Sequence, residues 1–376
     1  MTVAEGAMGF CLVLTTVQLV STATARWRCP ARRTPLPPPT DAPAVSILRP
    51  VCGLDNFADE TLRSSFLLDY PRYEVLFCAA RADDPVLPLV RQLIAEYPQV
   101  PSRVLIGDER VNNNPKLNNT LKGWKAAAHD WVIMADSNVA MPRDYVQRLL
   151  ASWGPDTGLV CSTPIGARPD GFWAEVECGF LNTLQARWQY AAEAIGLGFA
   201  QGKSMLWHKP MLESVGGIRV LGSELAEDAA ATKLVRRNGK KVKLVDSPFE
   251  QPLGHRTFDE VWSRQVRWAR LRRVTFPLFF TPEILTGALW PVLAAAFGAA
   301  SVGSHPAVAA LAVALIWYLA EAELARGAGW RLTWRSAPAW IVRDLLLPVM
   351  FVTAWLANDF VWRGNAMDVS ETEEAR

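Results

Sequence analysis

"WVIMADSN", residues 131–138, is an apolar run that ends abruptly in Asp136 and two further polar residues. A short apolar run bounded in this way is typical of a buried strand. Three further runs of this kind lie upstream, "AVSILRP" (44–50), "YEVLFCAA" (73–80) and "SRVLIG" (102–107). Helical patterns alternate with them at 60–71, 84–98 and 116–130. This alternation predicts an α/β fold in which helices cover the faces of a parallel sheet.

Composition narrows the functional classes. The chain has 376 residues, half of them apolar, and a formal net charge of only +2. A balanced charge does not favour a nucleic-acid partner, so we expect none. The six cysteines show no CxxC or Cys/His metal spacing. We interpret them as reduced and mostly buried, which points to an intracellular catalytic face.

Both ends of the chain carry apolar segments. Residues 6–25 hold no charge over about the length that crosses a bilayer. A cleaved signal peptide is the alternative, but no Lys or Arg precedes the segment. The basic flank "RWRCPARR" (26–33) marks that side as cytoplasmic, and a stiff Pro-rich linker (34–43) follows. Near the other end, 284–304 is the clearest span, with weaker ones at 306–325 and 340–362.

These segments predict four regions. An anchor and its basic flank occupy 1–33, an α/β catalytic domain 34–275, a membrane region of about three helices 276–365, and an acidic, disordered tail 366–376.

Acidic residues follow two of the predicted strands. Asp83 and Asp84 come after 73–80, and Asp136 ends 131–136. Ligands of open parallel sheets bind beyond the carboxyl ends of the strands, so these carboxylates should share one cleft. Taken singly, each is more typical of a helix cap or a turn, but the two together favour a site.

Three further stretches offer polar groups. In "NNNPKLNN" (112–119), Lys116 can meet a phosphate and Asn118 a sugar or base; a polar loop before a helix is the alternative. "GLGFAQGKS" (196–204) lacks the glycine that a P-loop needs at 197 and is interpreted as a glycine-rich wall of a small-molecule site. Glu227 and Asp228 fall in the first turn of a helix, where acidic residues are common for structural reasons.

The run "SRQVRWARLRR" (263–273) combines five arginines with a tryptophan. On a helix, Arg264, Arg267 and Trp268 share one face, which suits a diphosphate with a ring stacked beside it. The remaining arginines, at 270, 272 and 273, point elsewhere and are expected to meet lipid headgroups.

Eight segments resemble the ceramide glucosyltransferases, inverting enzymes of GT-A fold, in order and approximate spacing. They are "VSILRPVCGLD" (45–55), "LDYPRYEVLFC" (68–78), "DDP" (83–85), "NPKLNN" (114–119), "ADSN" (135–138), "GLVCSTP" (158–164), "AED" (226–228) and "RQVRW" (264–268). The resemblance covers residues 44–275 and the overall layout.

The resemblance implies a role for each site residue. Asp83 and Asp84 would hold the uridine and ribose of a UDP-sugar, with Lys116 at the diphosphate and Asn118 beside it. Asp136 would bind a divalent metal, Mg²⁺ or Mn²⁺, although the family's D-x-D reads Met134-Ala135-Asp136 here.

On the acceptor side, Asp228 would be the general base. The leaving diphosphate and the acceptor would meet Arg264, Arg267 and Trp268, and further acceptor-side candidates are Gly202, Ser204 and Glu227. The animal enzymes carry a His-Pro-Arg segment where this chain reads "QARWQY" (185–190), so acceptor details do not transfer there.

Taken together, the resemblance implies an integral enzyme of the bacterial inner membrane, with its catalytic domain on the cytoplasmic face. It would transfer a hexose, glucose first, from a UDP-sugar to the primary hydroxyl of ceramide, among membrane lipids. The alternatives are another lipid acceptor (a hopanoid or diacylglycerol), a polysaccharide synthase and a non-catalytic nucleotide-binding adaptor.

Both arginine clusters, 26–33 and 264–273, should face the cytoplasm, because cytoplasmic flanks of spans carry an excess of Lys and Arg. Single cysteines introduced in each cluster should resist a membrane-impermeant thiol reagent in intact cells and react once the cells are opened. Labelling in intact cells would contradict this orientation.

Overall fold

The computed structural model describes residues 2–31, 34–362 and 365–368. By their contacts these residues form two units, described separately. The sheet unit comprises 34–167 and 192–254, and the helical unit comprises 2–31, 168–191 and the described residues from 255 onward. Segments 168–191 and 255–275 therefore associate with the apolar helices, although the predicted catalytic domain runs without a break to 275. The predicted division of the chain into anchor, catalytic domain, membrane region and tail stays a prediction.

A seven-stranded sheet forms the centre of the sheet unit, with strand order β3-β2-β1-β4-β7-β5-β8. The strands are β1 (Val45–Val51), β2 (Tyr73–Ala79), β3 (Ser102–Ile106), β4 (Trp131–Ala135), β5 (Thr157–Ser162), β7 (Ser204–His208) and β8 (Lys241–Leu244). The first four match the predicted strands. The predicted α/β class is confirmed.

One strand departs from the expected parallel sheet. β7 lies between β4 and β5 and is antiparallel to both, whereas the pairs β1–β2, β1–β4, β2–β3 and β5–β8 are parallel. The expectation of a parallel sheet is therefore wrong for this strand. Hydrophobicity alone does not reveal strand direction, because a buried run looks the same whichever way it is traversed.

Helices cover both faces of this sheet. They are α2 (Ala58–Arg63), η1 (Ser64–Phe66), α3 (Leu87–Glu96), α4 (Pro115–Ala126), α5 (Tyr145–Ala151), α8 (Lys209–Glu213), η3 (Ile218–Ser223) and α9 (Glu227–Arg237). The predicted helix 60–71 is shorter in the structure, because α2 gives way to the 3₁₀ turn η1.

The core explains why the sheet is covered on two sides. Ile47 and Ile133 pack on the α5 side together with Tyr145. α4 packs on the opposite face of β1 and β2, so closely that a Cβ at Gly123 would lie 2.6 Å from the Cys78 sulfur. All of these apolar side chains are buried.

The order β2-β1-β4 creates a switch point. From β1 the chain moves to β2 and β3 on one side and returns with β4 on the other. Ligands of open α/β sheets bind at such points, outside the carboxyl ends of the strands. The residues that follow β1 and β4 are therefore the ones to examine for chemistry.

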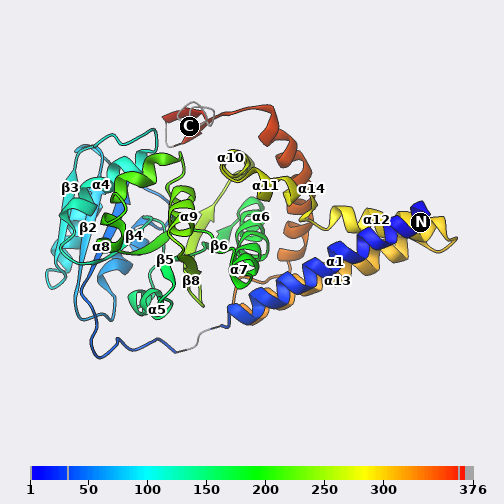
Figure 1. Cartoon of the computed structure of the whole chain (residues 1–376), viewed down its shortest axis with the longest axis horizontal. Helices are drawn as coiled ribbons and strands as arrows, with labels where there is room; N and C mark the ends of the chain where they lie inside the picture. Colours follow the sequence, from blue (N-terminus) through cyan, green and yellow to red (C-terminus); the bar gives the residue numbers. More distant parts are fainter. Residues whose placement is uncertain (1, 32–33, 363–364, 369–376) are drawn as a thin grey trace. The chain divides into compact units, whose positions relative to one another are not determined.

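The helical unit contains the apolar helices of both termini. Its elements are α1 (Val3–Arg28), α6 (Phe172–Gly179), the π-helix η2 (Phe180–Ala186), the start of α7 (Arg187–Ala194), α10 (Phe258–Thr275), α11 (Pro277–Phe280), η4 (Thr281–Leu285), α12 (Leu289–Ser301), α13 (Pro306–Ala328), α14 (Ser336–Leu356), β10 (Asp359–Trp362) and β11 (Asn365–Asp368). The short strands β6 (Ile165–Asp170) and β9 (Glu250–His255) pair with each other. α1 packs along α12 and α13 (Figure 1).

Three described helices, α1, α13 and α14, are long and apolar enough to cross a membrane. This agrees with the coarse prediction of a membrane protein. The expected ranking of the C-terminal spans is wrong, however. The favoured segment 284–304 is bent by 46° between 277–285 and 289–301, and the two segments judged weaker form the long helices. Of the predicted acidic tail, 366–368 belong to β11 and the rest lies outside the described residues.

Charged residues inside the long helices are paired, which is why they do not interrupt the spans. Arg343 in α14 contacts both oxygens of Glu321 in α13 at 2.9 Å and its neighbour Asp344 at 2.8 Å. The hydroxyl of Thr183 donates to Glu321 as well. All these side chains are buried. Intramembrane charges are tolerated when they face one another in this way.

Replacing Arg343 with Met should leave Glu321 and Asp344 buried without their guanidinium. Removing one partner of a buried ion pair costs about 3–5 kcal/mol, so the thermal unfolding midpoint of the detergent-solubilised protein should fall by several degrees. Arg326→Met is the matched control, because its ion pair with Glu323 on α13 is exposed. Equal losses in the two variants would contradict a stabilising role for the buried pair.

Candidate functional site

The carboxyl edge of β4 carries the first part of the site. Asp136 follows β4 directly, and its backbone N–H donates to the carbonyl of Lys203 at 2.9 Å. Because β7 is antiparallel, its first residue, Ser204, is the register partner of Ala135. The start of β7 therefore lies at the edge where β4 ends, and this brings Lys203 beside Asp136.

Lys116 connects the segments around this edge. It lies in the first turn of α4, which Asn114 caps by accepting the backbone N–H groups of Lys116 and Leu117. Its ammonium lies 2.7 Å from an oxygen of Asp136 and 2.7 Å from an oxygen of Glu227. It also donates to the carbonyl of Gly202. The Lys116 ammonium therefore joins the end of β4, the start of α9 and the residues just before β7.

The contacts of Lys116 determine its own ionisation state and that of Asp136. Burial alone would lower the pKa of Lys116, but the carboxylates of Asp136 and Glu227 raise it above its ordinary value. For Asp136, burial would raise the pKa, but Lys116 and Lys203 lower it well below its usual range. Both side chains therefore stay ionised across the neutral range.

Asp228 is the exception among these carboxylates. Burial, followed by the charge of Glu227, raises its pKa to about 6. Its side chain accepts the backbone N–H of Gly202 at 3.0 Å and that of Ala229 at 2.8 Å. A carboxylate with a pKa near neutrality is suited to accept a proton, because it exchanges protons readily at working pH.

Gly202 lies at the centre of the cluster. A Cβ there would come within 2.7 Å of Glu227, 3.0 Å of the Lys116 ammonium and 3.5 Å of Asp228. Glu227 is buried and is held by the side-chain amide of Asn114 at 2.6 Å. Only a residue without a side chain allows these charged groups to approach one another so closely.

Two other predicted site residues, Ser204 and Asn118, are buried and hydrogen-bonded to the protein. The hydroxyl of Ser204 is buried against that of Tyr145 at 2.8 Å, inside the core and not on a wall. Asn118 is buried too: its side chain accepts from Val111 at 2.7 Å and donates to Asn112 at 2.9 Å, which holds the preceding loop. Their predicted ligand roles stay predictions.

Asp83 and Asp84 behave differently from each other. Asp83 is exposed and forms an ion pair with Arg81, which lowers the pKa of that carboxyl. Asp84 turns inward and accepts the backbone N–H of Gly53 at 2.9 Å and that of Val86 at 3.0 Å. Asp84 thus ties the loop after β2 to the loop after β1, at the predicted cleft.

Asp136 has the chemistry of a metal ligand with a single protein carboxylate. Lys116 and Lys203 place an ammonium on each of its oxygens, at 2.7 and 2.9 Å, so cations already occupy this position. Among the residues that the structure describes, no group of three or more His, Cys, Asp or Glu forms a metal cage. Mg²⁺ often binds through one or two carboxylates plus substrate phosphates, so this donor set fits a metal that arrives with a phosphate.

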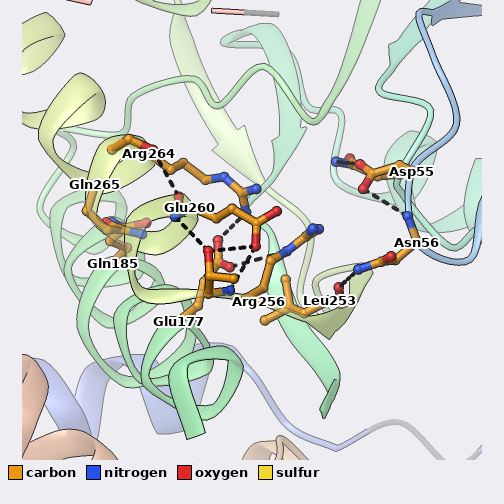
Figure 2. Close-up of polar contacts among 12 residues, drawn as sticks. Asp55, Asn56, Glu177, Gln185, Leu253, Arg256, Glu260, Arg264 and Gln265 are labelled. Atoms are coloured by element: carbon orange, nitrogen blue, oxygen red, sulfur yellow. Dashed lines mark hydrogen bonds and ion pairs between the residues drawn. The ribbon is translucent and has the colours of Figure 1, made fainter. Parts of the chain in front are cut away.

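The predicted arginine face lies on α10, in the helical unit. Arg264 donates to Glu177 of α6, whose carboxylate is fully buried, and Arg256 lies 3.7 Å from the same group (Figure 2). Arg267 and Trp268 are partly exposed. Arg264 therefore has a structural partner already, and its predicted diphosphate role, like those of Arg267 and Trp268, stays a prediction.

The other α10 arginines have protein partners, and their expected contact with lipid headgroups stays a prediction. Arg272 forms a bidentate pair with Glu283 at 2.7 and 2.8 Å, Arg273 lies over the Trp355 ring, and Arg270 donates to the carbonyl of Asp359. These guanidinium groups bind protein partners in the helical unit. The angular argument from the sequence could not detect this, because the partners lie up to 89 residues away.

One site residue was missed. The sequence offers Lys203 only within a stretch that fails as a P-loop, yet its ammonium lies 2.9 Å from Asp136 and 3.2 Å from Asn138. The signal that would have found it is the antiparallel direction of β7, which the sequence does not reveal.

The model of glycosyl transferase family 21 matches residues 13–375, and the chain belongs to this family. Ceramide glucosyltransferase 1 of Caenorhabditis elegans is 28% identical over 341 residues, 89% of this chain and 73% of the relative. Ceramide glucosyltransferase 3 of the same organism is 27% identical over 335 residues, 87% of this chain and 73% of the relative. The predicted resemblance is thereby confirmed.

A solved structure with partial likeness is a mannosyltransferase from Pyrobaculum calidifontis in complex with GDP-Man and Mn²⁺. It is 17% identical with a TM-score of 0.48, covering 93% of this chain and 98% of that one.

The raised pKa of Asp228 predicts a pH-dependent stability. Because the folded value is about 6 and the ordinary value 3.8, the protonated form is favoured in the folded state. Its contribution is fully present below about pH 4 and is lost as pH rises through about 6. Asp228→Asn, which is uncharged throughout, should therefore gain about 2 kcal/mol over the wild type between about pH 4 and 7.

Unfolding curves recorded across this range measure the difference. Asp156→Asn is the control, because Lys241 lowers the pKa of that exposed carboxyl and the trend should not appear. A difference between Asp228→Asn and the wild type that does not vary with pH would refute the assignment.

Proposed function

We propose that this chain transfers glucose from UDP-glucose to the primary hydroxyl of ceramide, with inversion at the anomeric carbon. The single observation that carries the proposal is the cluster around Gly202, in which a carboxylate of raised pKa adjoins a strongly held ammonium. Support also comes from the family and from two relatives named ceramide glucosyltransferase. We further propose that the enzyme works at the cytoplasmic face of a bacterial inner membrane.

In this mechanism, Asp228 accepts the proton of the acceptor hydroxyl. The hydroxyl oxygen bonds to the anomeric carbon as the bond from that carbon to the diphosphate oxygen breaks. The electron pair of that bond leaves with UDP. Attack on the face opposite the leaving group inverts the configuration.

The leaving diphosphate needs positive charge, and Lys116 is the residue assigned to provide it. Its ammonium is desolvated and preorganised, which makes it more effective than the same charge in water. Asp136 would hold Mg²⁺ or Mn²⁺, which when bound neutralises developing charge on the diphosphate.

The remaining assignments follow from the resemblance. Asp83 and Asp84 would hold the uridine end of the donor, with Asn118 near the diphosphate. Arg264, Arg267 and Trp268 would meet the leaving group and the lipid. Gly202, Ser204 and Glu227 would belong to the acceptor side.

The test is transfer by the purified full-length protein in lipid-containing detergent. UDP-glucose and UDP-galactose are each offered with ceramide, diacylglycerol and a hopanoid. The expected product is β-glucosylceramide, its configuration read by NMR. Asp228→Asn should lower kcat by about 10²–10⁴-fold, as expected for the loss of a general base.

Asp156→Asn, at an exposed ion pair, should keep wild-type turnover. Transfer only to diacylglycerol or hopanoid would refute the acceptor, transfer only from UDP-galactose would refute the donor, and undiminished turnover in Asp228→Asn would refute the base.

A further inference from the structure

Lys203 and Lys116 together occupy both oxygens of Asp136. The Lys203 ammonium lies 2.9 Å from Oδ2, and the Lys116 ammonium lies 2.7 Å from Oδ1. Lys203 also donates to the side-chain oxygen of Asn138 at 3.2 Å. The two lysine side chains are only 16% and 10% exposed, so water screens these contacts weakly.

The backbone keeps Lys203 in this position. Its carbonyl accepts the N–H of Asp136 at 2.9 Å, and the next residue, Ser204, pairs with Ala135 across the β4–β7 ladder. The ammonium is thus tethered to the strand beside Asp136. This distinguishes it from a mobile surface lysine that meets a carboxylate by chance.

Each oxygen of Asp136 already faces a positive charge, because Lys203 contacts one and Lys116 contacts the other. A divalent cation on Asp136 must therefore displace an ammonium, which then lies beside the cation and is repelled by it. A diphosphate that arrives with the cation brings negative charge and offers both lysines new acceptors.

We propose that Lys203 is a tethered cation that holds the metal-binding oxygen of Asp136 until a nucleoside diphosphate arrives, so that metal and donor enter together. This inference rests on the proposed function for the identity of the donor, but its central contact concerns Lys203, Asp136 and the metal alone. Because binding linkage is reciprocal, the diphosphate should tighten the metal as much as the metal tightens the diphosphate.

Mn²⁺ binding to the full-length protein tests the proposal, measured by the electron paramagnetic resonance signal of free Mn²⁺, with and without UDP. Wild type should bind Mn²⁺ weakly alone and at least tenfold more tightly with UDP. Lys203→Met should bind Mn²⁺ alone at least tenfold more tightly than wild type, with a smaller effect of UDP. Lys203→Arg, which keeps the charge, should remain weak without UDP.

Two controls accompany these variants. Lys209→Met removes a lysine just past the opposite end of β7, where the ammonium donates to the carbonyl of Ala127, and should match wild type. The double variant Lys203→Met/Asp136→Asn should lose the Mn²⁺ binding that Lys203→Met gains, which locates that metal on Asp136.

The outcomes separate the two proposals. The role of Lys203 is overturned if Lys203→Met and wild type bind Mn²⁺ alone equally weakly. It is also overturned if the wild type binds UDP but binds Mn²⁺ equally with and without it. If UDP binds no form of the protein, the proposed donor is wrong, and the nucleotide-free comparison still decides the role of Lys203. If no form binds Mn²⁺ under any condition, the metal assignment and this inference both fall.

Discussion

The ion pairs of Lys116 are the constraint on which the site depends. One ammonium joins the helix that carries it to the end of β4 and the start of α9, through Asp136 and Glu227 at 2.7 Å each. These segments are far apart in the sequence, and the sheet order alone does not specify how close their ends come. A buried cation between two carboxylates does specify it, because removing either partner leaves an uncompensated charge. For Asp228, burial and then the charge of Glu227 raise the pKa toward neutrality, and Lys116 opposes them.

Much of this arrangement could be predicted from the sequence. The strands β1 to β4 are apolar runs of ordinary strand length, and the residues after them fall at the ligand-binding edge for topological reasons. This argument places Asp136 at that edge, whereas Lys116 and Asp228 join the site through the family resemblance, and the roles of all three stay predictions. Lys203 cannot be placed there from the sequence, because its position depends on the direction of β7, and a fully buried strand carries no directional signal.

The long apolar helices contain charged residues whose partners lie far away in the sequence. Hydropathy favoured 284–304 because it is free of charged residues, yet that segment is bent, and the helices with buried charges are the long ones. Glu321 and Arg343 neutralise each other across α13 and α14. The arginines of α10 likewise bind protein partners at 272 and 273. Hydropathy therefore counts a charged residue against a membrane span even when a distant residue of opposite charge pairs with it.

The triplet Gly202-Lys203-Ser204 has a consequence for how this region tolerates insertions. Each of its residues meets a different requirement: no side chain, a charge beside Asp136, and a hydroxyl inside the core. Side chains alternate between the faces of a strand, so a shift of one residue would exchange these positions. A single residue gained between 202 and 204 would therefore move Lys203 away from Asp136 or Ser204 out of the core.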